Sequence, residues 1–211
     1  MQDKNGNIRQ ENTDTRRAEL IAATLRVIAR DGVRGATVRE ISKEADVTQG
    51  LIRYYFKTKD ELIAAAYETY MGDLVCMADE ASRGKATATK RLADFIRVSL
   101  EAPVTSHASV AIWAGFFETL LHDSAMTASH NRSYDRLRLH LKQLIADVQS
   151  ENGCTTDEAT LRRYSIAGNA ILDGLWLEGG ALPEAFKPGE LVKVGLESIG
   201  ALLGIDLESA T

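Results

Sequence analysis

Proline is scarce in this sequence of 211 residues, occurring only three times. No long stretch alternates apolar and polar residues with the period of two that half-buried strands require, so the chain is predicted to be all-α. No apolar run approaches the roughly 20 residues that a membrane-spanning helix needs. The first 13 residues are polar and lack the pattern of a signal peptide. We therefore expect a soluble, cytoplasmic protein with no membrane contact, whose residues 1–13 form a disordered tail.

Cysteine is equally rare, and its placement excludes several kinds of site. Cys76 and Cys154 stand alone, without a CxxC pair or a histidine at metal-ligand spacing, as is typical of reduced thiols in the cytoplasm. The four histidines are scattered, and none forms a ligand pair with nearby carboxylates. No nucleophile elbow, phosphate loop or Ser–His–Asp order occurs. The sequence predicts no metal, no cofactor and no enzyme activity.

The net charge of −5 argues at first against a nucleic-acid partner. The charge is unevenly distributed, however. Residues 1–60 contain twelve Lys and Arg against nine Asp and Glu, whereas the remainder contains thirteen against twenty-one. A local basic patch is sufficient for phosphate contacts, while an acidic remainder keeps a protein soluble.

Two short helices are predicted within the basic segment. Thr37 followed by Glu40 has the capping-box pattern, and apolar residues then recur on one face of the first helix. Thr48 is placed to cap a second helix that runs through Phe56. Two helices joined by three or four residues form a helix-turn-helix, whose second helix enters the DNA major groove.

The second helix has an apolar inner face and a polar outer one. Val47, Ile52 and Phe56 are expected to point inward. Arg53 has the donors to bind guanine through two hydrogen bonds, and Gln49 can pair with adenine. Gly50 lowers helix propensity by about 1 kcal/mol relative to Ala, which is reasonable where DNA must approach closely. A plain helical hairpin with solvated charges is the alternative. The clustering of basic and aromatic residues favours a DNA-binding face comprising Thr37, Arg39, Thr48, Gln49, Gly50, Leu51, Arg53, Tyr54, Tyr55, Lys57 and Lys59.

This segment resembles the DNA-binding domain of the TetR family of bacterial transcriptional regulators. The resemblance is carried by Asp31-Gly32, by Ala36 to Ile41, by Val47 to Gly50 and by Tyr54 to Leu62, which together span about the first quarter of the chain. It implies phosphate contacts from Tyr55 and Lys59, and a base-facing stretch from Thr48 to Arg53. It also implies a regulator, most often a repressor, that binds a palindromic DNA operator as a dimer and is released by a small molecule.

The rest of the chain is read as helical, giving about nine helices in all. We expect a DNA-binding domain over residues 14–57 and a ligand-binding and dimerisation domain over residues 58–211. Capping boxes at Thr58–Glu61 and Thr155–Glu158 mark two helix starts. Gly179-Gly180 and two prolines are expected to surround a loop. Other helices are predicted over residues 14–31, 58–81, 87–100, 105–122, 124–150, 155–178 and 190–203.

The last two helices are apolar on more than one side, which is typical of buried helices. By the family resemblance they form the homodimer interface, although an internal core explains the same pattern. The block from Ala170 to Leu177 further resembles the BetI-type branch of the family, whose namesake represses choline-to-betaine genes. The branch often has Ser-His where this chain has Arg53-Tyr54, which leaves the operator sequence open.

Aromatic and acidic residues in the expected ligand-binding and dimerisation domain suggest an effector site. Such residues form cages for quaternary ammonium cations. They are equally typical of core packing, and a site for a lipophilic drug or metabolite in control of efflux is a further alternative. A helical interaction protein without DNA binding is the rival from another class. The predicted ligand-binding residues are Trp113, Phe116, Phe117, Glu118, Asp173 and Trp176.

Overall fold

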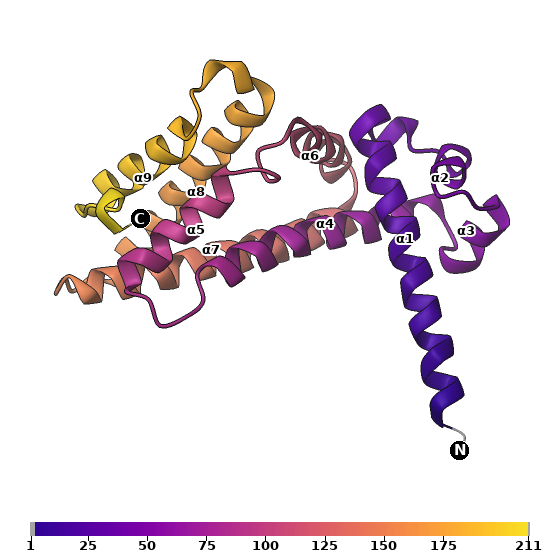
Figure 1. The fold of residues 1–211 in the computed structure, drawn as a ribbon, viewed down its shortest axis with the longest axis horizontal. Helices are drawn as coiled ribbons and strands as arrows, with labels where there is room; N and C mark the ends of the chain where they lie inside the picture. Colours follow the sequence, from indigo (N-terminus) through magenta and orange to yellow (C-terminus); the bar gives the residue numbers. More distant parts are fainter. Residues whose placement is uncertain (1–2, 211) are drawn as a thin grey trace. The chain divides into compact units, whose positions relative to one another are not determined.

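The computed structural model describes residues 3–210, and within that range the chain forms nine α-helices, two short 3₁₀ turns and no strand (Figure 1). The all-α prediction is confirmed. No helix in the described range is both long and apolar enough to cross a bilayer. The 3₁₀ turns cover Pro183–Ala185 and Glu208–Ala210. The helices are α1 (Asp3–Gly35), α2 (Val38–Glu44), α3 (Gln49–Tyr55), α4 (Lys59–Ala81), α5 (Ala88–Leu100), α6 (His107–Leu120), α7 (Ser124–Glu151), α8 (Glu158–Ala181) and α9 (Glu190–Leu203).

Helix α1 begins earlier than the sequence indicates. It starts at Asp3 rather than Asp14, so residues 3–13 are helical instead of forming the expected disordered tail; residues 1 and 2 lie outside the described range. No proline interrupts these residues, and a helix that is already nucleated extends by one hydrogen bond per residue. Gly32, expected to end the helix, has φ 70° and ψ 172° and breaks it before a last turn through Gly35.

The caps of the helix-turn-helix follow the prediction. Thr37 caps α2 by accepting a hydrogen bond from the amide of Glu40, and Thr48 caps α3 by accepting one from Leu51. These bonds satisfy amides that a helix start would otherwise leave unpaired.

Two details of the C-terminal part differ from the prediction. Asp157 caps α8 in place of Thr155, because its carboxylate accepts from the amide of Thr160 at 2.7 Å. Gly179 and Gly180 border the loop between α8 and α9 as expected, but they form the buried last turn of α8, which ends at Ala181 rather than at about Glu178. A Cβ on Gly180 would lie 2.2 Å from Cγ2 of Val110, so glycine here allows close packing and does not end the helix.

The chain divides into two compact units. The first contains the residues up to Met71 together with Ala111–Thr127, and the second contains Gly72–Val110 and the residues from Ala128 onward. The predicted domain boundary at residues 57 and 58 therefore does not coincide with the division into units: the first unit also holds the start of α4 and much of α6. Its buried side chains include Ile28, Ile41, Ile52, Phe56, Leu62, Tyr67 and Phe116.

The second unit is built around α8 and α9, which pack on each other and on α5 (Figure 1). Leu92, Phe95 and Ile96 of α5 are completely buried, as is Ile199 of α9. They share one apolar core with side chains of α7 and α8. Trp176 is partly buried and packs against this core.

Candidate DNA-binding surface and effector residues

Helix α3 separates an exposed polar face from a buried apolar one. Ile52 and Phe56 are 2% and 1% exposed, as predicted, whereas Val47 is only half-buried. Tyr54 is 79% exposed, although an aromatic side chain gains by burial. Gln49, Gly50 and Arg53 are exposed beside it, and Leu51 and Tyr55 are half-buried.

Gly50 is not required by packing within the protein. The nearest atom to a Cβ placed there is Oγ1 of Thr48, at 3.8 Å. The conformation of Gly50 is also ordinary helix, since it is absent from the positive-φ positions of the described chain. Neither packing within the protein nor backbone conformation therefore accounts for a glycine at this exposed site.

The turn between α2 and α3 is fixed by backbone bonds. Asp46 has φ 52°, the left-handed conformation that short Asp and Asn side chains tolerate better than most residues. The amide of Val47 donates to the carbonyl oxygen of Ser42 at 2.9 Å, which closes the turn. The path of the chain between the two helices is thus fixed by local backbone geometry.

Arg17 of α1 contacts the C-terminal end of α3. The sequence analysis did not identify this residue. Its guanidinium carbon lies 4.3 Å from the centre of the Phe56 ring. It also donates to the carbonyl oxygen of Tyr55 at 3.3 Å, one of the carbonyls that a helix end leaves unpaired. No sequence motif links residues 17 and 56, so only their meeting in space identifies this contact.

The remaining predicted DNA-binding residues lie around the ends of α2 and α4. Thr37, Arg39 and Lys57 are exposed. Lys59 is half-buried, and its ammonium group donates to the carbonyl oxygen of Val33 at 3.2 Å. An ammonium group has three N–H donors, so Lys59 can make this hydrogen bond and still donate to an anion.

The four predicted effector residues of α6 lie in the first unit and have different surroundings. The rings of Trp113 and Phe117 stack with their centres 4.8 Å apart, and Phe117 is 42% exposed. Phe116 is completely buried and meets Tyr67 edge to face at 5.1 Å. Glu118 forms an ion pair with Arg34 of α1.

The two predicted effector residues of α8 lie in the second unit. Burial raises the pKa of Asp173 to about 6, although Arg138 and hydrogen bonds from Asn169 and Tyr134 act in the opposite direction. The side-chain amide of Asn169 donates to the carboxylate at 2.7 Å. The indole N–H of Trp176 donates to the carbonyl oxygen of Val104 at 2.6 Å, which fixes its ring.

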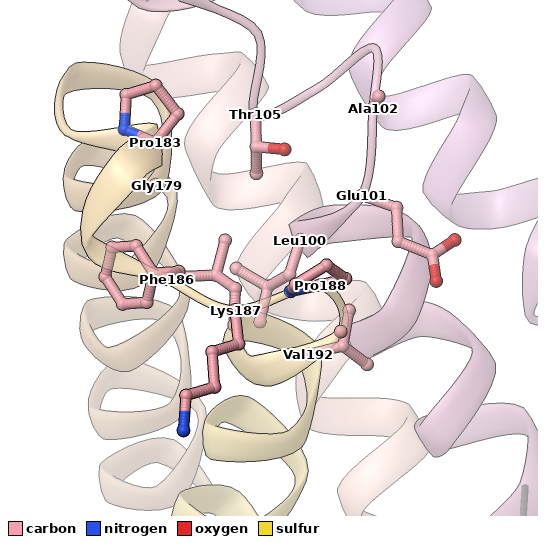
Figure 2. A pocket seen from close by; sticks show the side chains of 12 residues that line it. Leu100, Glu101, Ala102, Thr105, Gly179, Pro183, Phe186, Lys187, Pro188 and Val192 are labelled. Carbon is pink, nitrogen blue, oxygen red and sulfur yellow. The ribbon is translucent and has the colours of Figure 1, made fainter.

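A separate cavity of about 390 Å³ lies in the second unit (Figure 2). Its wall is formed by the end of α5, the segment that follows it and the loop between α8 and α9. Apolar side chains such as Leu100, Phe186 and Val192 line it, with Glu101 and Lys187 beside them. None of the predicted effector residues contributes to its wall.

A capped pair of short helices, with basic and aromatic side chains exposed on the second, defines a helix-turn-helix DNA-binding protein. Comparison with known proteins identifies the family. Residues 20–66 match the profile described as bacterial regulatory proteins, tetR family. Residues 88–204, more than half of the chain, match the profile of the C-terminal part of BetI-type transcriptional repressors. The chain belongs to the TetR family and is a transcriptional regulator rather than an enzyme.

Individual relatives agree with this assignment. The HTH-type transcriptional regulator BetI of Vibrio vulnificus is 31% identical over 82% of this chain and 84% of its own length. The structure of a transcriptional regulator from Pseudomonas aeruginosa PAO1 is 30% identical and superposes with a TM-score of 0.81, covering 94% of this chain and 95% of the other.

Two further structures share the fold at lower identity. A regulator from Saccharomonospora viridis in complex with choline has a TM-score of 0.73 at 18% identity, covering 90% of this chain and 96% of the other. FadR of Bacillus subtilis in complex with stearoyl-CoA has a TM-score of 0.68 at 21% identity, covering 88% and 96%.

Proposed function

We propose that this regulator is a cytoplasmic repressor that binds a palindromic DNA operator as a homodimer and releases it on binding a small cation of the quaternary ammonium class. The observation that carries the DNA-binding part is the exposure of Gln49, Arg53 and Tyr54 on α3, over a buried face that fixes the helix. Exposed donors on a rigid helix are what readout of base edges requires.

The proposed contacts fall into two groups. Gln49, Leu51 and Arg53 read bases, because they project from the N-terminal part and middle of the recognition helix. Thr48, Tyr55, Lys57 and Lys59 bind phosphates and set the register. Thr37, Arg39, Gly50 and Tyr54 complete the surface. In a dimer, two copies of α3 would enter successive major grooves about 34–36 Å apart.

The proposed dimer interface lies on α8 and α9. Apolar and small residues recur along one exposed side of α8, and a Cβ on Gly174 would meet nothing within 4 Å. Ile166 and Leu177 are 38% and 43% exposed in the single chain. A second copy packed on this side would remove the stripe from water, which favours association. The stripe comprises Ile166, Ala170, Gly174, Leu177 and Ala181.

Sedimentation measurements test the interface. Replacing Ile166 and Leu177 together by Glu should convert a dimer into a monomer, because two charges would be buried without partners. Leu139→Glu is the matched control, since Leu139 is 62% exposed on α7. A double variant that sediments like the unmodified dimer would rule out this interface.

The proposed effector contacts begin with Asp173. Burial removes part of the hydration of a carboxylate and so disfavours its charged form. A cation bound beside it stabilises that charged form. Trp176 follows three residues later on the same helix, and a tryptophan ring is the preferred face for a cation. Trp113 and Phe117 are proposed as a second, separate group of contacts in the first unit. The choline complex of the Saccharomonospora viridis regulator and the BetI relatives support this class of effector.

Fluorescence anisotropy with labelled DNA tests the whole proposal. Duplexes selected from a random pool should share a palindrome, and choline should weaken their binding to the protein. Trp176→Ala and Trp113→Ala should each be examined for loss of the choline response. If stearoyl-CoA releases the DNA and choline does not, the effector is an acyl compound and the cation assignment is wrong.

A further inference from the structure

Helix α6 contacts the last turn of α1 through an ion pair and through close packing of a glycine against its backbone. Glu118 of α6 forms an ion pair with Arg34 of α1. A Cβ on Gly115 would lie 3.3 Å from Cγ2 of Val33 and 3.5 Å from its backbone nitrogen, so glycine lets α6 approach this turn closely. All of these residues belong to the first unit.

This last turn of α1 is held apart from the rest of its helix. Gly32 breaks the helix at φ 70° and ψ 172°. The amide of Thr37 donates to Gly35 at 2.7 Å instead of continuing the helical ladder to Val33. The carbonyl oxygen of Val33 accepts instead from the ammonium group of Lys59, at 3.2 Å. One short turn therefore contacts both α6 and a side chain proposed to bind phosphate.

We infer that Glu118 is a positioning residue for DNA binding, which acts through Arg34 and the Val33 carbonyl on the ammonium group of Lys59. The inference rests on the proposed phosphate contact of Lys59. It gives Glu118 a role different from that of an acid in an effector cage. A movement of α6 would displace the turn at Val33 and change where Lys59 presents its charge.

The ion pair is exposed, with Glu118 and Arg34 side chains 53% and 87% accessible, so it contributes little to folding stability. Glu118→Gln should therefore leave the thermal midpoint unchanged, which allows its effect on DNA to be measured in a folded protein. Removing a carboxylate also makes the protein more positive, which by itself strengthens binding to any duplex. A positioning role for Glu118 thus predicts weaker DNA binding by Glu118→Gln, whereas the general charge effect predicts stronger binding.

A double-mutant cycle on a duplex of arbitrary sequence at low salt tests the inference. Glu184→Gln, an exposed residue of the second unit, is the matched control for charge. We expect Glu118→Gln to weaken binding by at least about twofold when Lys59 is present, and to have no such effect in a Lys59→Met background. Lys59→Met itself should make the slope of log affinity against log salt concentration shallower by about one.

Two outcomes would overturn the inference. Glu118→Gln could strengthen binding as Glu184→Gln does, or it could weaken binding equally with and without Lys59. If the unmodified protein fails to bind duplex DNA at low salt, the proposed DNA-binding function itself is refuted. Anisotropy of the unmodified protein separates that failure from the first two.

Discussion

The guanidinium group of Arg17 lies over the ring of Phe56, with its central carbon 4.3 Å from the ring centre. The same group donates to the carbonyl oxygen of Tyr55, the last residue of α3. Arg17 thus holds the C-terminal end of α3 through the buried ring of Phe56 and the carbonyl of Tyr55. It therefore supports the helix that carries the proposed DNA-binding face.

Arg17→Leu should reduce affinity for duplex DNA, because the end of α3 loses a cation–π contact and a carbonyl partner. Cation–π contacts contribute about 0.5–2 kcal/mol. The matched control is Arg16→Leu, which removes the same charge from an exposed pair with Glu19. Gel-shift titrations of the two variants give the comparison. Equal losses would mean that net charge, and not support of α3, explains the effect.

Gly50→Ala should stabilise the fold and weaken DNA binding at the same time. Alanine favours helix by up to about 1 kcal/mol and meets no atom of the protein closer than 3.8 Å. The added methyl group would instead meet DNA at the exposed face of α3. Thermal unfolding and anisotropy on the same sample measure both effects. A variant that is more stable and binds DNA normally would remove Gly50 from the interface.

The pKa of Asp173 makes the stability of the fold depend on pH. Its folded pKa of about 6 lies above the ordinary 3.8, so the folded state holds the proton more tightly than the unfolded state. Ionised Asp173 therefore destabilises the fold, and its contribution to stability falls as pH rises between these two values. Asp173→Asn should be more stable than the unmodified protein at about pH 7, and this advantage should vanish below about pH 4.

Urea unfolding at a series of pH values measures this difference. A constant difference between Asp173→Asn and the unmodified protein would show that the carboxylate does not titrate in this range. Choline offers a second readout. If the cation binds ionised Asp173, choline should raise the unfolding midpoint more at about pH 7 than at about pH 5, since protonation removes the attraction.

Gly180→Ala should destabilise the second unit by about 1–3 kcal/mol, because the new methyl group would overlap Val110 and crowd the carbonyl oxygen of Thr105. Gly72→Ala in α4, also in the second unit, is the control, since nothing lies within 4 Å of its Cβ position. Chemical unfolding distinguishes the two. Similar midpoints for both variants would mean that α8 shifts at no cost to accept the side chain.

Local signals in the sequence identify much of the helix-turn-helix. Thr37 and Thr48 each cap a helix three residues before the amide that they accept from, which is a short-range rule that needs no tertiary information. The same rule misplaced the cap of α8, because Thr155 and Asp157 are both suitable caps and only the path of the chain decides between them. The end of α8 was placed three residues too early because a glycine pair is a turn signal, whereas the close contact of Gly180 with Val110 is visible only in the fold.

Contacts between distant segments lie beyond such rules. Arg17 and Tyr55 are 38 residues apart, and Arg34 and Glu118 are 84 apart. The start of α5 depends similarly on Glu151 of α7, whose carboxylate accepts from the amides of Ala88 and Thr89. Sequence periodicity shows which face of a helix is apolar but not which partner it meets, so these positioning residues appear only once the fold is known.

Comparison of Arg53→Ala with the unmodified protein on selected and scrambled duplexes tests the central claim most directly. If Arg53 reads a base on an exposed recognition helix, the variant should lose about 1–3 kcal/mol on the selected palindrome and should no longer discriminate at one base position of each half-site. Its affinity for the scrambled duplex should change much less. An equal loss of affinity on both duplexes would contradict base reading by α3.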